Sequence, residues 1–182
     1  MADEPIAHTS DTLKALSSPL RRSILRQLGT HGPATSTTIG QALGENTGTT
    51  SYHLRQLAAA GLIAEIPERA KGRERWWRTV PADRRTPPRA SMSDEDKTVH
   101  DELERARIAE DYATISAALA DRDALGEWLQ GSRGRAFMTL DQLRSFHEDY
   151  LKLLRRYGKD ADGAPEGARA VTVRWFAFVD ES

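Results

Sequence analysis

The chain has 182 residues, of which 38% are hydrophobic and 29% charged, enough for one domain or two small ones. It contains no cysteine, which excludes disulfides, thiolate nucleophiles and cysteine-ligated metals. No apolar run approaches the roughly 18 residues that span a bilayer, and the acidic start MADEPIAHTS lacks the basic and apolar regions of a signal peptide. We therefore expect a cytoplasmic protein without a membrane partner.

The charge is divided unevenly along the chain. Residues 1–90 hold 13 Lys or Arg against 8 Asp or Glu, whereas residues 91–182 hold 13 against 19. A basic first half beside an acidic second half favours contact of the first half alone with a polyanion, although uneven charge is also common in soluble proteins.

Short helices are expected at the start of the chain. The first carries Leu13 and Leu16 after a cap at Ser10 or Asp11, and the second follows Pro19, since proline suits the first helical position. A third helix is expected after a cap at Ser36 and before Gly44. Its inward residues would be Ile39, Ala42 and Leu43.

A fourth helix and a hairpin complete this region. The helix starts at Asn46 or Thr47, covers residues 47–60 and is closed by Gly61. Residues 62–66 alternate apolar and polar as a half-buried strand does, and residues 74–80 are aromatic and β-branched enough to pair back. The last three of these four helices, followed by a hairpin with a basic tip, are the order of a winged helix-turn-helix domain, here over residues 9–80.

The second half is expected to be mostly helical. Residues 81–93 contain three prolines and no apolar period, which indicates a linker. A long helix then starts at Asp94 and either continues or breaks near Asp121. A further helix covers residues 140–157 after a cap at Thr139, and the alternation in residues 170–179 predicts a strand. The predicted fold is therefore mainly α with a small β-hairpin wing. Residues 94–182 would form a dimerisation and possible effector-binding region.

The helix over residues 47–60 has two distinct faces at 100° per residue. Thr50, Leu54 and Leu57 fall on the side that must face the core. The opposite side is small and hydroxylated at its start and carries no acid from Asn46 to Gly61. Such a face suits insertion into a DNA major groove better than the Glu, Lys and Gln of an ordinary surface helix. The candidate DNA-binding residues of this helix are Thr47, Gly48, Thr49, Ser51, Tyr52, His53 and Arg55.

These residue types have distinct uses in a groove. Hydroxyl groups bond bases or phosphates, an arginine reaches a guanine edge or a phosphate, and a helix N-terminus favours a phosphate. His53 lies at the edge of the core face, so we expect packing more than base reading from it.

The hairpin tip over residues 67–75 forms a candidate wing. Arg69, Lys71, Arg73 and Arg75 alternate there, and in a strand alternate residues share one face. A row of this kind suits phosphates or a narrow minor groove. Trp76 and Trp77 would point to opposite faces, one of them into the core.

Two motifs together resemble the ArsR-type winged-helix regulators. The segment LKALSSPLRRSIL over residues 13–25 is similar to the opening of that family, and SYHLRQL over residues 51–57 with AGLI over residues 60–63 is similar to its recognition helix and strand. The resemblance covers residues 9–80 and implies a homodimeric transcription factor, usually a repressor, that binds a partly palindromic operator in double-stranded DNA. It also implies base-proximal positions for Thr47, Gly48, Thr49, Ser51, Tyr52 and Arg55.

The chain departs from the metal-sensing members of that family. The third helix lacks their paired cysteines, and neither His100 nor His147 has a second histidine at a matching interval. We therefore expect no metal and no cofactor. An unidentified small-molecule effector stays open, with Tyr112, Trp128, Phe137, Phe146, Trp175 and Phe178 as pocket walls; the favoured alternative is that these aromatics are the core of the second half.

The sequence allows three classes of function to be compared. A dimeric DNA-binding regulator is favoured, and a winged-helix adaptor that binds protein instead of DNA is the alternative. An enzyme is not expected, because the sequence offers no nucleophile–base pair, no P-loop and no metal cluster.

Overall fold

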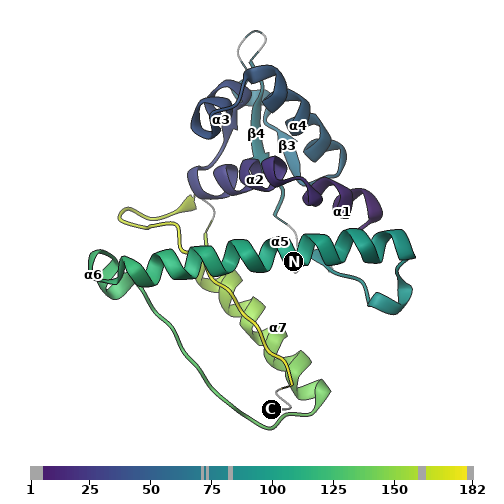
Figure 1. Ribbon diagram of the computed structural model, residues 1–182. Helices are drawn as coiled ribbons and strands as arrows, with labels where there is room; N and C mark the ends of the chain where they lie inside the picture. Colours follow the sequence, from purple (N-terminus) through teal and green to yellow (C-terminus); the bar gives the residue numbers. More distant parts are fainter. Residues whose placement is uncertain (1–5, 71, 73, 82–83, 160–162, 180–182) are drawn as a thin grey trace. The chain divides into compact units, whose positions relative to one another are not determined.

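The computed structural model describes residues 6–70, 72, 74–81, 84–159 and 163–179. It divides into two compact units, residues 1–108 and residues 109–182, which we describe separately (Figure 1). No helix of the described residues is both long enough and apolar enough to span a membrane.

The first unit begins with four helices in the expected order. These are α1 (Ser10–Ser17), α2 (Pro19–His31), α3 (Ser36–Leu43) and α4 (Thr47–Ala59). Two expected caps are wrong by one residue or more. Thr9 caps α1 and Thr35 caps α3: the side-chain hydroxyl of each accepts a hydrogen bond from the backbone amide three residues further along. This bond satisfies an amide of the first helical turn that has no partner within the helix, so the later residues are not needed as caps.

A three-stranded antiparallel sheet completes the winged helix-turn-helix fold. It consists of β2 (Ala34–Thr35), β3 (Ile63–Glu65) and β4 (Trp76–Thr79), with β4 in the centre. Ala34 lies opposite Trp77, and Ile63 lies opposite Thr79. The two strands of the wing hairpin are those that the sequence predicts, while β2 was not expected.

The helices and the sheet enclose one apolar core. Ile24, Ile39, Leu54 and Leu57 are completely inaccessible to solvent, and Trp77 closes the sheet side. The expected inward set of α3 needs one correction: Ala42 is exposed, and Gly40 is buried in its place. Because α1 to α4 all contribute residues to this core, the core holds the four helices in fixed positions.

The expected linker over residues 81–93 is partly structured. Within it, β5 (Arg84–Arg85) pairs in parallel with β1 (Ile6–Ala7), and η2 (Arg89–Ser91) is a turn of 3-10 helix. Met92 is buried. The prolines prevent an α-helix in this segment, but an extended part of it can still pair with a neighbouring strand.

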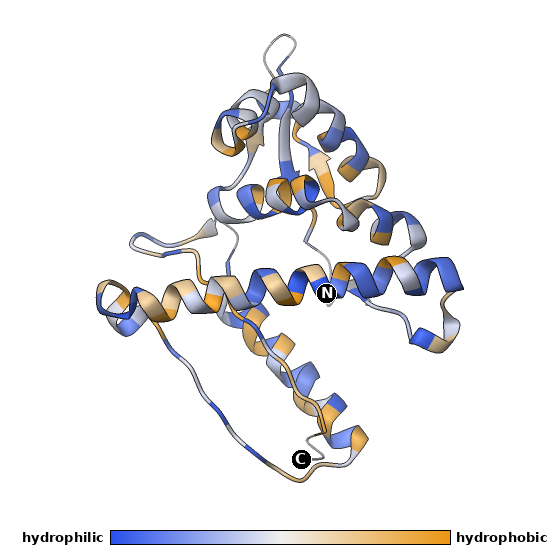
Figure 2. Cartoon of the chain, viewed as in Figure 1, coloured by the Kyte–Doolittle hydropathy of each residue, from blue (hydrophilic) through white to orange (hydrophobic). Residues whose placement is uncertain are grey.

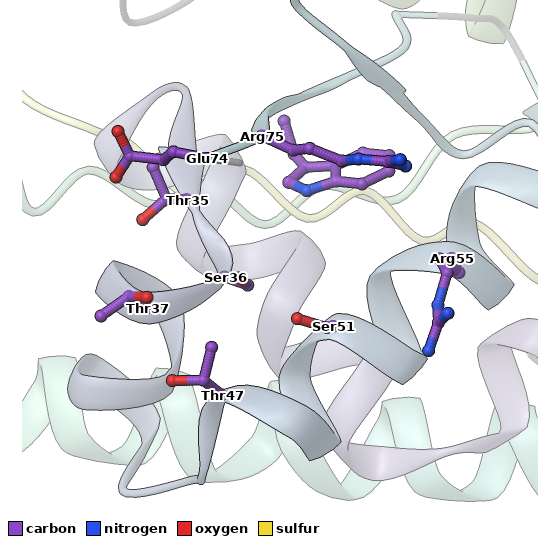
Figure 3. Close-up of a pocket in the computed structure, with 9 residues that line it drawn as sticks. Thr35, Ser36, Thr37, Thr47, Ser51, Arg55, Glu74 and Arg75 are labelled. Carbon is purple, nitrogen blue, oxygen red and sulfur yellow. The ribbon is translucent and has the colours of Figure 1, made fainter. Parts of the chain in front are cut away.

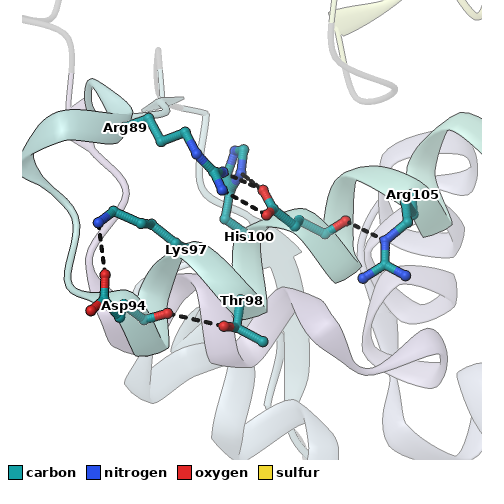
Figure 4. Close-up of polar contacts among 7 residues, drawn as sticks. Arg89, Asp94, Lys97, Thr98, His100 and Arg105 are labelled. Atoms are coloured by element: carbon teal, nitrogen blue, oxygen red, sulfur yellow. Dashed lines mark hydrogen bonds and ion pairs between the residues drawn. The ribbon is translucent and has the colours of Figure 1, made fainter.

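The long helix α5 (Asp94–Ala120) starts in the first unit and is fixed there by charges. Arg89 donates two parallel hydrogen bonds to the carboxylate of Asp101 (Figure 4). Lys14 lies 2.8 Å from Glu95. The pair lowers the pKa of Asp101, mainly through the hydrogen bond from Arg89. Leu103 of α5 is buried against the core of the unit. The start of α5 is thus part of the same body as α1 to α4.

The second unit holds the rest of α5 and three further helical pieces. The helix ends at Ala120 and is followed by α6 (Arg122–Leu125), η3 (Gly126–Trp128) and α7 (Leu140–Tyr157). The break near Asp121 is the one that the sequence allowed. Thr139 and Gln142 form a capping box at the start of α7, as expected from the threonine.

The strand expected over residues 170–179 is not formed. The segment runs back along α7 without a hydrogen-bonded strand beside it (Figure 1). A strand exists only where a second strand accepts and donates its backbone hydrogen bonds, and among the described residues of this single chain there is none for it.

The aromatic residues of the second unit do not form the expected core. Phe137, Phe178 and Tyr112 are 104%, 81% and 75% exposed, and none of the described residues from 109 to 179 is buried. Figure 2 shows orange, hydrophobic residues along the second half of α5 and on α7, open to solvent.

Candidate nucleic-acid interface

The turn between α3 and α4 is set by a close approach of backbone. The amide of Glu45 donates to the carbonyl of Gly40 at 2.8 Å, and Gly44 takes the left-handed conformation with φ of 70°. A Cβ on Gly40 would stand 2.8 Å from the carbonyl oxygen of Glu45. Only glycine therefore allows α4 to leave α3 this tightly.

The start of α4 is held by its cap and its inward face. The side chain of Asn46 accepts a hydrogen bond from the amide of Thr49 at 2.8 Å, and the hydroxyl of Thr50 donates to the carbonyl of Asn46 at 3.0 Å. Thr50, Leu54 and Leu57 are buried, as the helical wheel predicts. Because these three residues point into the core, the opposite face of α4 must point away from it.

That opposite face is open to solvent at the predicted positions. Thr47, Gly48, Tyr52 and Arg55 are exposed, while Thr49, Ser51 and His53 are half-buried. Among the described residues, none forms a hydrogen bond or an ion pair with the Arg55 guanidinium. The arginine is therefore available to an external acceptor.

An open groove of about 480 Å³ joins this face to the wing. Figure 3 shows its lining from three places in the chain: the end of β2 with the start of α3, α4 as far as Arg55, and β4 with the two residues before it. The residues that line it are Thr35, Ser36, Thr37, Thr47, Ser51, Arg55, Glu74, Arg75 and Trp77. Hydroxyl groups and two arginines dominate, and both α3 and α4 begin here, so that two helix N-termini face the same space.

Two acidic groups bear on the charge of this groove: Glu74 lines it, and Glu65 lies beside Arg75. Glu65 lies 3.6 Å from Arg75, both partly exposed. Glu74 and Arg75 point in opposite directions, as neighbours on an extended chain do, and Arg75 shares its side with Arg55 (Figure 3). The side of the groove that carries α4 is thus the positive one.

His53 behaves as a packing residue, in line with its position at the edge of the core. Its ring meets that of Tyr52 edge-on, with centroids 5.2 Å apart. Partial burial lowers the pKa of His53, and the charge of Arg21 lowers it further. The buried Nδ1 has no hydrogen-bond partner among the described residues.

The wing departs from the predicted row of four cations. Arg69 ends a short 3-10 helix, η1 (Pro67–Arg69), instead of lying in a strand, and its guanidinium stacks 5.8 Å from the ring of Trp76. Proline at the start of that turn ends the strand at Glu65, so the alternation does not extend to Arg69. Arg75 is exposed beside β4. Lys71 and Arg73 lie outside the described residues.

Sequence reasoning missed part of the groove lining. The hydroxyl residues Thr35, Ser36 and Thr37 line the groove, although they were considered only as a helix start. The sequence did contain a signal for this lining, because a helix N-cap needs one hydroxyl residue and residues 35–38 are four in a row. Among the described residues, no three His, Asp or Glu gather in a way that could hold a metal ion.

One family model matches part of the chain. Residues 16–66 match a family described as a helix-turn-helix domain. A search of curated proteins gave no match.

Several solved structures resemble the chain weakly. A possible transcriptional regulatory protein fragment from Mycobacterium bovis is 23% identical over 54% of this chain and 85% of its own, with a TM-score of 0.35. YusO from Bacillus subtilis is 15% identical over 80% and 79%, with a TM-score of 0.37. PcaV from Streptomyces coelicolor, solved with its natural ligand, is 17% identical over 78% and 77%, with a TM-score of 0.34. Values this low support no inference about function.

Proposed function

We propose that this chain binds double-stranded DNA as a transcriptional regulator, with the first half of α4 in the major groove. The observation that carries the proposal is the exposed face of α4: small and hydroxylated at its start, free of acid, and ending in an unpartnered Arg55. Small side chains let the helix backbone approach the bases, and Arg55 reaches a guanine edge or a phosphate. The match of residues 16–66 to a helix-turn-helix family supports the same function.

The groove beside α4 is suited to the phosphate backbone. Its hydroxyl groups, two helix N-termini and Arg75 are the donors that phosphates accept from in protein–DNA complexes. We assign the wing over residues 67–75 to the backbone or the minor groove, with Arg75 as its described contact.

We further propose that the working form is a homodimer and that the regulator is a repressor. The second half of α5 supports the dimer: residues 112–120 (YATISAALA) carry no charge on any side of the helix, and Tyr112, Ile115 and Leu119 are exposed. A helix segment with exposed apolar residues and no charged face is expected to pack against other apolar surface. A two-fold dimer would present two copies of α4 to half-sites about 34 Å apart. An unidentified small-molecule effector would act through the second unit.

A mobility-shift titration against salt tests the DNA-binding proposal. Because phosphate contacts release counterions, affinity for a duplex should fall steeply as salt rises. Arg55→Ala should weaken binding to the preferred duplex by about 1–3 kcal/mol, whereas Arg156→Ala, at the end of α7, should change it little. Failure to bind any duplex at low salt would favour the protein-binding adaptor. Equal affinity of Arg55→Ala and the unmodified chain would contradict the assigned face.

A further inference from the structure

Tyr52 is the residue of α4 that points most directly away from the core. At 100° per residue, it lies within about 15° of the direction opposite to the buried Thr50, Leu54 and Leu57. Among the described residues of the first unit, only Tyr52 and Ile108 are large, apolar and exposed, and Ile108 belongs to α5. An aromatic ring therefore stands at the centre of the face that the proposed function places in the major groove.

The residues before Tyr52 leave its ring free to reach outward. One turn earlier, Gly48 has no side chain, and a Cβ there would meet only the side chain of Asn46, at 3.2 Å. Residues 47–51 are all small, and no acid occurs between Asn46 and Gly61. Tyr52, whose side chain is 51% exposed, is consequently the first residue of α4 that is long enough to reach the floor of a groove.

The ring of Tyr52 is supported by its neighbour in the sequence. It meets the imidazole ring of His53 edge-on, with centroids 5.2 Å apart and planes at 75°. Aromatic pairs in this geometry attract each other beyond simple burial. Because His53 is half-buried at the edge of the core, its ring is a fixed support for the tyrosine. A side chain that is already oriented loses little conformational entropy on binding, which favours a specific contact.

Tyr52 lies outside the groove that suits the phosphate backbone. The α4 residues that line that groove are Thr47, Ser51 and Arg55, on the flank of the helix that faces the wing. Tyr52 is not one of the lining residues. With the backbone contacts on this flank, the outermost side of α4 faces the floor of the major groove, where the base edges lie.

We infer that Tyr52 is a specificity-determining residue whose ring packs against the C5-methyl group of a thymine. The inference rests on the proposed function and adds a base that the regulator selects. Guanine, adenine and cytosine present hydrogen-bonding groups in the major groove, which a polar side chain would read, whereas thymine also presents a methyl group. The apolar edge of an aromatic ring matches that methyl group.

The spacing along α4 places this thymine relative to the base that Arg55 contacts. Residues 52 and 55 are about 4.5 Å apart along the helix axis, and successive base pairs are about 3.4 Å apart along the duplex. The thymine is therefore expected within about one or two base pairs of the position at which Arg55→Ala relaxes the preference.

Replacing thymine by deoxyuridine tests the contact, because it removes the methyl group and leaves the hydrogen-bonding groups of the base in place. The probe is the duplex that the unmodified chain selects from a random library, with one thymine replaced at a time. At one position the replacement should weaken binding about fourfold, the value for one buried methyl group. Tyr52→Ala should bind the thymine and deoxyuridine duplexes equally well.

Tyr52→Phe is the matched control, since it keeps the ring and removes only the hydroxyl group. This variant should retain the preference for thymine. Loss of the preference in Tyr52→Phe would assign the role of the residue to its hydroxyl group and overturn the methyl contact. Each variant is compared on two duplexes in one preparation, so the ratio of the two affinities does not depend on the fraction of protein that is folded.

The same titrations separate this inference from the proposed function. Binding in which no thymine methyl matters, or in which Tyr52→Ala keeps the preference for thymine, overturns the thymine contact and leaves DNA binding through Arg55 intact. A chain that binds no duplex at low salt contradicts the proposed function and this inference with it.

Discussion

The two units of this chain use apolar residues in opposite ways. In the first, Ile24, Ile39, Leu54 and Leu57 are fully buried behind a polar surface. In the second, the side chains of Phe137, Phe178 and Tyr112 are largely exposed to solvent, and no described residue is buried. A self-contained unit can carry a precise reading surface, while a unit without a core must obtain its stability from association. The proposed function uses this difference: recognition is proposed for the first unit and assembly for the second.

The largest expected effect separates the two kinds of apolar residue. Leu57→Ala should lower the free energy of unfolding of the first unit by about 2–5 kcal/mol, because it opens a cavity in a packed core. Leu153→Ala, at a position 52% exposed on α7, should leave the first unit unchanged. Hydrogen exchange of the α4 amides measures both. A similar loss in the two variants would show that the units are not independent.

A smaller effect tests the close contact within the first unit. Gly40→Ala should cost about 1–3 kcal/mol, since its Cβ would meet the carbonyl of Glu45 and push α4 away. Gly29→Ala is the matched control: nothing lies within 4 Å of its Cβ in α2, so alanine should stabilise the unit by about 0.5–1 kcal/mol through helix propensity. Urea denaturation shows whether each substitution raises or lowers the free energy of unfolding. Two stabilised variants would contradict the tight turn.

The smallest effect is a dependence of the first unit on pH. The lowered pKa of His53 means that the unfolded chain takes up its proton more readily than the folded one. Stability is therefore complete above the ordinary value near 6.5 and declines as pH falls below it. The loss should be smaller than the effect of either core substitution, because the ring is only partly buried. Melting at pH 7.5 and 5.5 should show a larger decrease for the unmodified chain than for His53→Gln; equal decreases would assign the effect to other groups.

The success of sequence analysis follows the same division. Helix periodicity predicted α1 to α4, with the N-caps of α1 and α3 misplaced by one residue or more. The wheel predicted the inward face of α4, because local rules decide these elements. The long helix and the helix at residues 140–157 were also predicted. The closeness of Gly40 to Glu45 and the groove formed with Thr35 to Thr37 depend on how distant residues meet, which periodicity does not contain.

The failures lie mainly where pairing partners decide the structure. The prolines of residues 81–93 indicated a linker, yet Arg84–Arg85 found a strand at Ile6–Ala7. The alternation of residues 170–179 indicated a strand, yet one chain holds no partner for it among the described residues. Sequence reports the capacity to form a strand, whereas its formation depends on a second segment.

Selection of duplexes from a random library by the whole 182-residue chain tests the central claim most directly, because it requires a reading unit and an assembling unit at once. The account predicts enrichment of an inverted repeat whose half-sites are centred about 10–10.5 base pairs, or a multiple of that, apart, and loss of preference at one position of each half-site with Arg55→Ala. A library that stays random after repeated rounds, or a single half-site without a repeat, would contradict it.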